Sequence, residues 1–253
     1  MPDDRDGPYF IGFLPAPRAL RGFLLACALV IVAIFAGVSW LIGATQDDPG
    51  PGAFRFDYGR QTITGVVELM PYPLMRVTEG SEHIPTGHTI MLSAGGKRGL
   101  MPRAAPLDGQ LAVASGVILS RGDLDMLQLR GGTNGLKPAE GEAPEVETEP
   151  LGRWRIAGEI CDGKCLVGAM RPGRGLAHKA CANLCIVGGI PPVLVSTQPI
   201  DGSEFLLVAG PDGGAMPDPL YDHVGAFIEI EGEVERRGDL LVFRADPDSV
   251  KVF

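Results

Sequence analysis

The chain has 253 residues, enough for one large domain or two small ones, and it carries 36 glycines and 22 prolines. Glycine and proline occur in turns far more often than inside helices, so this composition favours short strands over a helical bundle. The formal net charge of -9 repels phosphate backbones, and the basic residues are scattered, which argues against nucleic acid as a partner.

An uncharged apolar stretch at residues 22–43 predicts a single transmembrane helix, since about 20 residues suffice to cross the hydrocarbon layer. Its flanks differ in charge, with basic residues before it and acidic residues after it, namely Arg18, Arg21, Asp47 and Asp48. Because Lys and Arg next to a span remain on the cytoplasmic side, residues 1–21 are expected to form a short cytoplasmic tail. The rest of the chain is then expected on the opposite side of the membrane, outside the cytosol.

A cleaved signal peptide is the alternative interpretation of this stretch. Its apolar core would be only about 7 to 15 residues long and would end in a small-x-small site, where this chain has Trp40 and Leu41. An uncleaved anchor is therefore favoured. The expected location is the bacterial inner membrane, with a single span and the C-terminal region in the periplasm.

Two segments rich in Pro and Gly divide the remaining chain. Residues 44–54 predict a stalk, because Pro removes backbone donors and Gly adds backbone freedom. Residues 133–150 hold five glutamates among Pro and Gly, with almost nothing to bury, and predict an acidic flexible linker. The predicted modules are residues 55–132 and residues 151–253.

These two modules resemble each other when strand-like runs and turns are compared in order. Each contains a strand with an early glycine, Gly65 or Gly158, and ends in a hairpin with an Arg-Gly-Asp turn, at residues 121–123 or 237–239. The span from 65 to 116 covers 51 positions and the matching span from 158 to 232 covers 74, so the second copy has 23 extra residues.

About five short strands with a long middle connection fit a small closed barrel of the oligonucleotide/oligosaccharide-binding (OB) type, and a β-sandwich is the alternative. Closure into a barrel also removes the exposed sheet edges that short strands otherwise leave. The predicted fold is therefore mainly β: one transmembrane helix followed by two tandem OB-like barrels, the second with a short helix that bears Cys and His.

The second module contains a cysteine and histidine pattern, C-x3-C-x12-H-x2-C-x3-C, made of Cys161, Cys165, His178, Cys181 and Cys185. Residues 176–187 are rich in Ala and Leu and predict a short helix that ends at the following pair of glycines. At 100° per residue the histidine and the last two cysteines share one face of this helix, which would look towards the first two cysteines.

Three chemistries fit this pattern. Outside the cytosol, thiols oxidise, so two disulfides are one interpretation. A zinc or copper ion held by thiolates and imidazole is the second. A reactive dithiol is the third, since nearby cations lower thiol pKa values. Those cations are also candidate contacts for an anion or a partner: Lys164, Arg171, Arg174 and Lys179.

The region from Gly158 to Val195 resembles a motif of uncharacterised bacterial membrane-anchored or exported proteins. The resemblance is carried by the two cysteine pairs, by His178 and by the Gly-Gly-Ile-Pro-Pro run at residues 188–192. It implies a recurring module and no activity.

The sequence identifies no reaction. We find no G-x-S-x-G elbow, no H-E-x-x-H helix and no C-x-x-C-H haem-attachment motif, so common hydrolase, zincin and c-type cytochrome explanations lack support. The favoured hypothesis is a non-enzymatic, membrane-anchored periplasmic binding protein that acts with a membrane or envelope complex. The alternative is a thiol redox or metal-binding protein that uses the Cys/His cluster, and an enzyme is the least favoured option.

Overall fold

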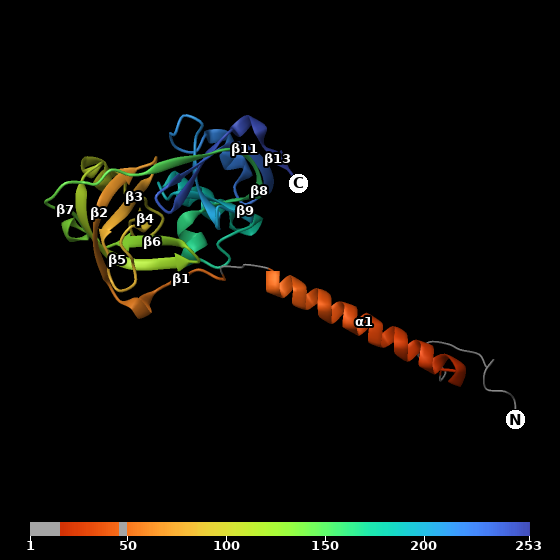
Figure 1. Ribbon diagram of the computed structural model, residues 1–253. Coiled ribbons are helices and arrows are strands. Elements are labelled where there is room, and N and C mark those ends of the chain that lie inside the picture. The colour runs from red at the N-terminus through yellow and green to blue at the C-terminus, as the bar shows by residue number, and fades with distance from the viewer. Residues whose placement is uncertain (1–15, 46–49) are drawn as a thin grey trace, which may run out of the picture. The chain divides into compact units, whose positions relative to one another are not determined.

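The computed structural model describes residues 16–45 and 50–253, in two units that divide between Asp48 and Pro49. The first unit contains the helix α1 (Arg18–Thr45), drawn in red and orange in Figure 1. Residues 18–44 are long and apolar enough to cross a membrane, as the sequence predicts. Length and composition fit an anchor or a signal sequence equally. Most of the predicted cytoplasmic tail lies outside the described residues.

The second unit begins with a closed five-stranded barrel (barrel 1, Figure 1). Neighbouring strands are antiparallel except β4 and β6, which are parallel, and β5 closes the barrel by pairing with both β2 and β6. Two short strands also pair with β5. The elements are β1 (Ala53–Phe54), β2 (Gln61–Leu69), β3 (Pro73–Glu79), β4 (Thr89–Ser93), α2 (Met101–Ala104), β5 (Leu111–Arg121), β6 (Leu124–Leu129) and β7 (Leu136–Pro138).

A second closed barrel (barrel 2) repeats this topology, with β10 and β12 as the parallel pair and β11 pairing with both β8 and β12. The third strand thus pairs with the fifth in both barrels, and the prediction of two tandem OB-like barrels is confirmed. The elements are β8 (Thr148–Asp162), α3 (Lys179–Val187), β9 (Pro192–Ile200), β10 (Ser203–Ala209), β11 (Phe227–Arg237), β12 (Leu240–Ala245) and β13 (Lys251–Val252).

Glycines recur at matching places in the two barrels because strands approach closely there. A Cβ atom at Gly116 would clash with the carbonyl oxygen of Gln128, and one at Gly232 would clash with that of Arg244. The hairpin turns also match: Gly122 and Gly238 have φ of 58° and 66°, a left-handed conformation that glycine adopts without strain.

The acidic segment 133–150 differs from a featureless linker. It contains β7, which pairs with β5, and its last residues already form the start of β8 opposite Arg236 and Arg237 of β11. Glu149 and Arg236 form an ion pair. Most of the segment is exposed, so the strands there are held by backbone pairing and charge and bury little apolar surface.

Each barrel has its own apolar core, and a third core lies between the barrels. In barrel 2, alternate residues of β9, β10 and β12 face the barrel interior, and the residues between them face barrel 1. These strands are therefore buried on both faces, which explains their continuous apolar runs. The inter-barrel core includes Leu74, Met91, Leu119 and Met126 of barrel 1 and Val193, Phe205, Leu207 and Val242 of barrel 2.

A charged group at the edge of this inter-barrel core centres on His88. Its Nδ1 lies 2.5 Å from Asp239 Oδ2, and its Nε2 lies 3.2 Å from Asp125 Oδ2. Asp239 belongs to the Arg-Gly-Asp turn of barrel 2, and its second oxygen accepts a hydrogen bond of 2.7 Å from the Thr89 amide. His88 therefore joins the two barrels, whereas its loop position in the sequence indicates an ordinary surface histidine.

We expect His88 to make stability depend on pH. Burial lowers the pKa of His88, but hydrogen bonds to Asp125 and Asp239 outweigh burial and raise it from 6.5 to about 9. A raised folded-state pKa stabilises the fold below pH 6.5, and the stabilisation is lost as pH rises through about 9. Because Asp239 is partly exposed, the expected loss is about 1 to 2 kcal/mol.

Chemical denaturation of the wild-type protein and of His88→Gln between pH 6 and pH 10 measures this loss. The variant should be less stable at low pH and should lack the decline. His223→Gln is the control, since it removes a half-buried histidine elsewhere in barrel 2 and should keep the wild-type pH dependence. An equal decline in all three proteins would contradict the assignment.

Candidate metal centre

The cysteine and histidine cluster lies in the connection between β8 and β9 of barrel 2. The matching connection of barrel 1, between β2 and β3, contains only residues 70–72. Most of the extra length of the second copy is therefore inserted at this place. It forms a tight turn after Asp162, an irregular helical turn over residues 165–169, a short 3-10 turn over Leu176–His178, and α3.

The end of α3 confirms that the two glycines terminate the helix. Gly189 has φ of 89°, its amide donates to the Ile186 carbonyl at 2.8 Å, and the Ile190 amide donates to the Cys185 carbonyl at 3.0 Å. Gly188 accepts a 2.7 Å hydrogen bond from the Gly99 amide of barrel 1, and a Cβ atom at Gly188 would clash with the Lys97 carbonyl oxygen. The same glycines thus bring the insertion against barrel 1.

Four of the five predicted ligands lie in two overlapping groups that could hold a metal ion. The ligand atoms of Cys165, His178 and Cys181 lie within 4.8 Å of one another, and so do those of Cys165, Cys185 and Asp162. Cys165 belongs to both groups, so the two groups adjoin at its sulfur. All of these residues are buried except Cys181, which is partly exposed.

Asp162 organises the centre although the sequence pattern does not include it. Its Oδ1 accepts a hydrogen bond of 2.8 Å from the Cys165 amide, and its Oδ2 lies 3.1 Å from His178 Nε2. The carboxylate and the imidazole are almost completely buried. A carboxylate on one ring nitrogen orients a histidine and leaves the other nitrogen, Nδ1, for a metal, as is usual among metal-binding histidines.

Two lysines place positive charge beside the thiols. Lys97, from the β4–α2 loop of barrel 1, has its Nζ 2.5 Å from Cys181 Sγ and 3.7 Å from Cys185 Sγ. Lys164 is buried, and its Nζ donates to the carbonyl oxygens of Ala94 at 2.5 Å and Gly96 at 2.9 Å. The cluster therefore lies where the insertion of barrel 2 meets a loop of barrel 1.

The thiol pKa values differ within the cluster. A hydrogen bond from Cys165 lowers the pKa of Cys185, with a contribution from Lys97, and the same bond together with burial raises the pKa of Cys165. Burial lowers the pKa of Lys164 to about 8, against the attraction of the neighbouring thiolates and Asp162. The arrangement thus makes Cys185 easier to deprotonate than Cys165.

Cys161 does not join the ligand groups among the described residues. Its thiol donates to Glu159 Oε1 at 3.2 Å, and burial, followed by the charge of Glu159, raises its pKa well above the usual value. Successive residues of a strand point to opposite faces, so β8 directs Asp162, and not Cys161, towards His178.

The other predicted contact residues are separately engaged. Arg171 donates to the Gly52 carbonyl at 3.4 Å, Arg174 lies 3.6 Å from Glu159, and Lys179 donates to the Asp222 carbonyl at 2.6 Å. Lys164 donates to the carbonyl oxygens of Ala94 and Gly96 in the β4–α2 loop of barrel 1. The structure therefore does not bring these four cations together around one hollow.

The donor set fits a soft or borderline metal ion. Three sulfurs and one imidazole nitrogen match the Cys3His set of tetrahedral zinc sites, and thiolates also suit copper. Zinc with three thiolates and a neutral imidazole has a net charge of about -1, and Asp162 adds another negative charge. The positive charges of Lys97 and Lys164 balance these two negative charges. The prediction of two disulfides is not supported, since all five cysteines are free thiols.

No known protein family, curated protein or solved structure matches this chain in the comparisons we made.

Proposed function

We propose that this protein is a membrane-anchored accessory protein that presents its two barrels as one binding unit to a membrane or envelope partner. The proposal further assigns α1 as a single span, with the short tail in the cytosol and the barrels in the periplasm. The basic residues before the span and the acidic residues after it support this orientation. Tethering raises the effective concentration of the barrels near membrane neighbours.

The observation that carries the proposal is the contact between the barrels. Barrel 1 and barrel 2 share an apolar core, a partly buried ion pair and the Cys/His cluster. In that pair, Arg237 Nε lies 3.0 Å from Glu68 Oε2. Two barrels fixed in this way present one rigid surface, and a rigid surface binds a partner with little loss of conformational entropy.

In this proposal the cluster holds one zinc ion through Cys165, His178, Cys181 and Cys185. The ion stabilises the insertion against the loop of barrel 1 that carries Lys97, and so fastens the two barrels. An intact four-ligand set leaves no open coordination position, which is typical of structural zinc sites. Bound metal would also protect these close thiols from oxidation outside the cytosol.

Two measurements test the anchoring and binding parts of the proposal. A reporter that is active only outside the cytosol, fused after Phe253, should be active, and activity of a cytosol-only reporter would overturn the orientation. Cross-linking in intact membranes, followed by solubilisation, should recover one recurring membrane or envelope protein. Failure to recover any recurring membrane or envelope protein would overturn the binding part of the proposal.

A thiol redox protein is the second candidate function, favoured by the position of Cys185 next to Cys165, whose hydrogen bond lowers the pKa of Cys185. The Cys185 thiolate would attack a disulfide of a partner, and Cys165 would resolve the mixed disulfide, so that two thiols are oxidised while the partner disulfide is reduced. Both sulfurs are buried, which favours the metal. Trapping of a mixed disulfide with Cys165→Ser, but not with Cys161→Ser, would support the redox function.

A further inference from the structure

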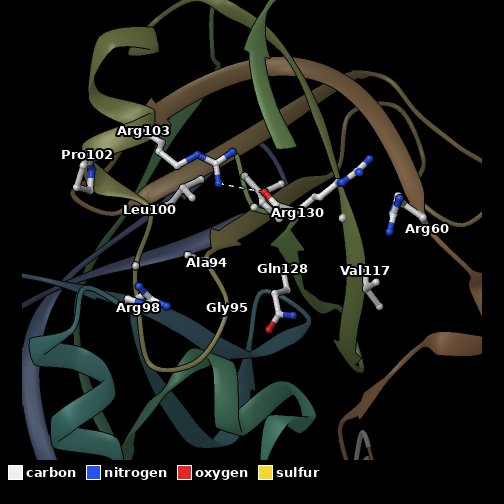
Figure 2. Close-up of a pocket in the computed structure, with 14 residues that line it drawn as sticks. Arg60, Ala94, Gly95, Arg98, Leu100, Pro102, Arg103, Val117, Gln128 and Arg130 are labelled. Atoms are coloured by element: carbon white, nitrogen blue, oxygen red, sulfur yellow. Dashed lines mark hydrogen bonds between the residues drawn. The ribbon is translucent and has the colours of Figure 1, made fainter. Parts of the chain in front are cut away.

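An open hollow on barrel 1, separate from the Cys/His cluster, has a volume of about 630 Å³. Its wall includes four arginines, together with Gln128 and Gly95: Arg60, Arg98, Arg103 and Arg130. Figure 2 shows Arg103 and Arg98 on one side of the hollow and Arg60 on the other, with Arg130 between them. The volume lies within the range of small-molecule sites.

The charge around this hollow is opposite to that of the protein. The chain has 31 acidic and 22 basic residues, yet the lining contains four arginines and no Asp or Glu. Within residues 16–45 and 50–253, none of the four arginines forms an ion pair with a carboxylate. Four uncompensated positive charges at one hollow attract an anion.

One of these arginines is held in place by the fold. Arg103 donates to the Arg130 carbonyl oxygen at 3.2 Å and to the Gly132 carbonyl oxygen at 2.8 Å (Figure 2 marks the first). These bonds fix its guanidinium beside the end of β6. A guanidinium presents five donors in a planar fork, so the bonds to carbonyls leave further N–H groups for a ligand.

The remaining arginines are exposed and can close on a ligand from different elements. Arg98 comes from the β4–α2 loop, Arg130 follows β6, and Arg60 precedes β2. Glycines at the rim, Gly95 and Gly131, have open space where a side chain would be, so a ligand can approach the backbone there.

We propose that this hollow binds the phosphate groups of a small ligand, either a soluble phosphate compound or a lipid headgroup. Planar guanidinium forks match phosphate oxygens in bidentate pairs, and several forks around one hollow favour a ligand with more than one negative charge. This inference goes beyond the proposed function and uses none of the residues of the metal centre.

Isothermal titration of the full-length protein in a neutral detergent tests the proposal with two probes. Pyrophosphate represents the soluble source, and short-chain phosphatidic acid represents the lipid headgroup, with short-chain phosphatidylcholine as its control. We expect at least one phosphate probe to bind with about one site per chain, and affinity to fall as salt rises. Binding of pyrophosphate alone would select the soluble source, and binding of phosphatidic acid alone the lipid.

Matched charge variants complete the test. Arg60→Gln with Arg130→Gln should weaken binding about tenfold or more, because two of the four forks are removed. Arg153→Gln with Arg155→Gln removes the same charge from the surface of barrel 2, where both arginines are exposed, and should change the affinity less than about twofold. The metal content should be the same in all variants.

Equal weakening by both double variants would overturn the proposal, since it would mean general electrostatic attraction. The absence of saturable binding of either probe up to about 1 mM would overturn it as well. Arg98→Gln provides a second variant, which should weaken binding if Arg60 and Arg130 prove important for folding. Neither outcome bears on the proposed zinc site, because that proposal is tested separately by the metal content of the protein.

Discussion

Replacing Cys185 by serine is expected to reduce bound zinc from about one ion per chain to nearly none. The hydroxyl is a poor ligand for zinc compared with a thiolate, and the loss leaves three ligands around a buried ion. Because the cluster lies between the insertion and barrel 1, we also expect the free energy of unfolding to fall by about 3 to 5 kcal/mol. Metal analysis after gel filtration and thermal unfolding measure the two effects.

Cys161→Ser is the matched control for this variant. The change is chemically the same, and the residue is equally buried, but its sulfur lies outside the ligand groups and contacts Glu159. We expect it to retain about one zinc ion per chain. Full zinc content in Cys185→Ser, or equal loss in both variants, would contradict the assignment of the centre. Removal of zinc from the wild-type protein by a chelator should reproduce the loss of stability.

Replacing Phe205 by alanine is expected to destabilise the whole barrel pair by about 3 to 5 kcal/mol. Phe205 is 1 % exposed and lies in β10 with its side chain in the inter-barrel core, where it is among the largest buried groups. Its removal leaves a cavity that faces both barrels. Since the two barrels share this core, they should still unfold in one transition, measured by fluorescence and by circular dichroism in denaturant.

Phe227→Ala removes the same side chain from the surface of barrel 2, where Phe227 is 49 % exposed and contacts Phe253. Its expected cost is about 1 kcal/mol or less. Two separate transitions in the wild-type protein, or equal costs for the two variants, would contradict the shared core. Two transitions found only in Phe205→Ala would instead show that this residue couples the barrels.

The contact between the two barrels underlies each of these expected effects. The apolar core, the His88 group and the Cys/His cluster all contribute to it, and each responds to a different agent. Denaturant acts on the core, high pH deprotonates His88, and a chelator would remove a metal held by the cluster. When substitutions at these separate sites are combined, their changes in unfolding free energy should add wherever the side chains do not touch.

Local patterns were sufficient to predict much of this protein. The apolar run of residues 22–43 predicts α1, and the repeated hairpins with Gly122 and Gly238 predict a duplicated barrel, because a turn and a strand are encoded by neighbouring residues. The helical spacing of His178, Cys181 and Cys185 also predicts a shared face, and all three reach the centre.

One available signal was missed. The runs Val193–Val195, Phe205–Ala209 and Leu240–Phe243 are apolar at every position, although a barrel strand with one solvent face should alternate. Continuous runs of this kind indicate burial on both faces, and therefore a second layer. They were consistent with packed barrels rather than modules separated by a flexible segment.

The sequence by itself determined the elements, their order, the turns and one face of the site, since each depends on residues within a few positions of one another. Only the tertiary structure decided which groups complete the site and which residues join the barrels. Lys97 lies 84 positions from Cys181, and His88 lies 151 positions from Asp239. Such pairs arise when two barrels pack against each other, and packing depends on the shape of whole surfaces, which no local spacing encodes.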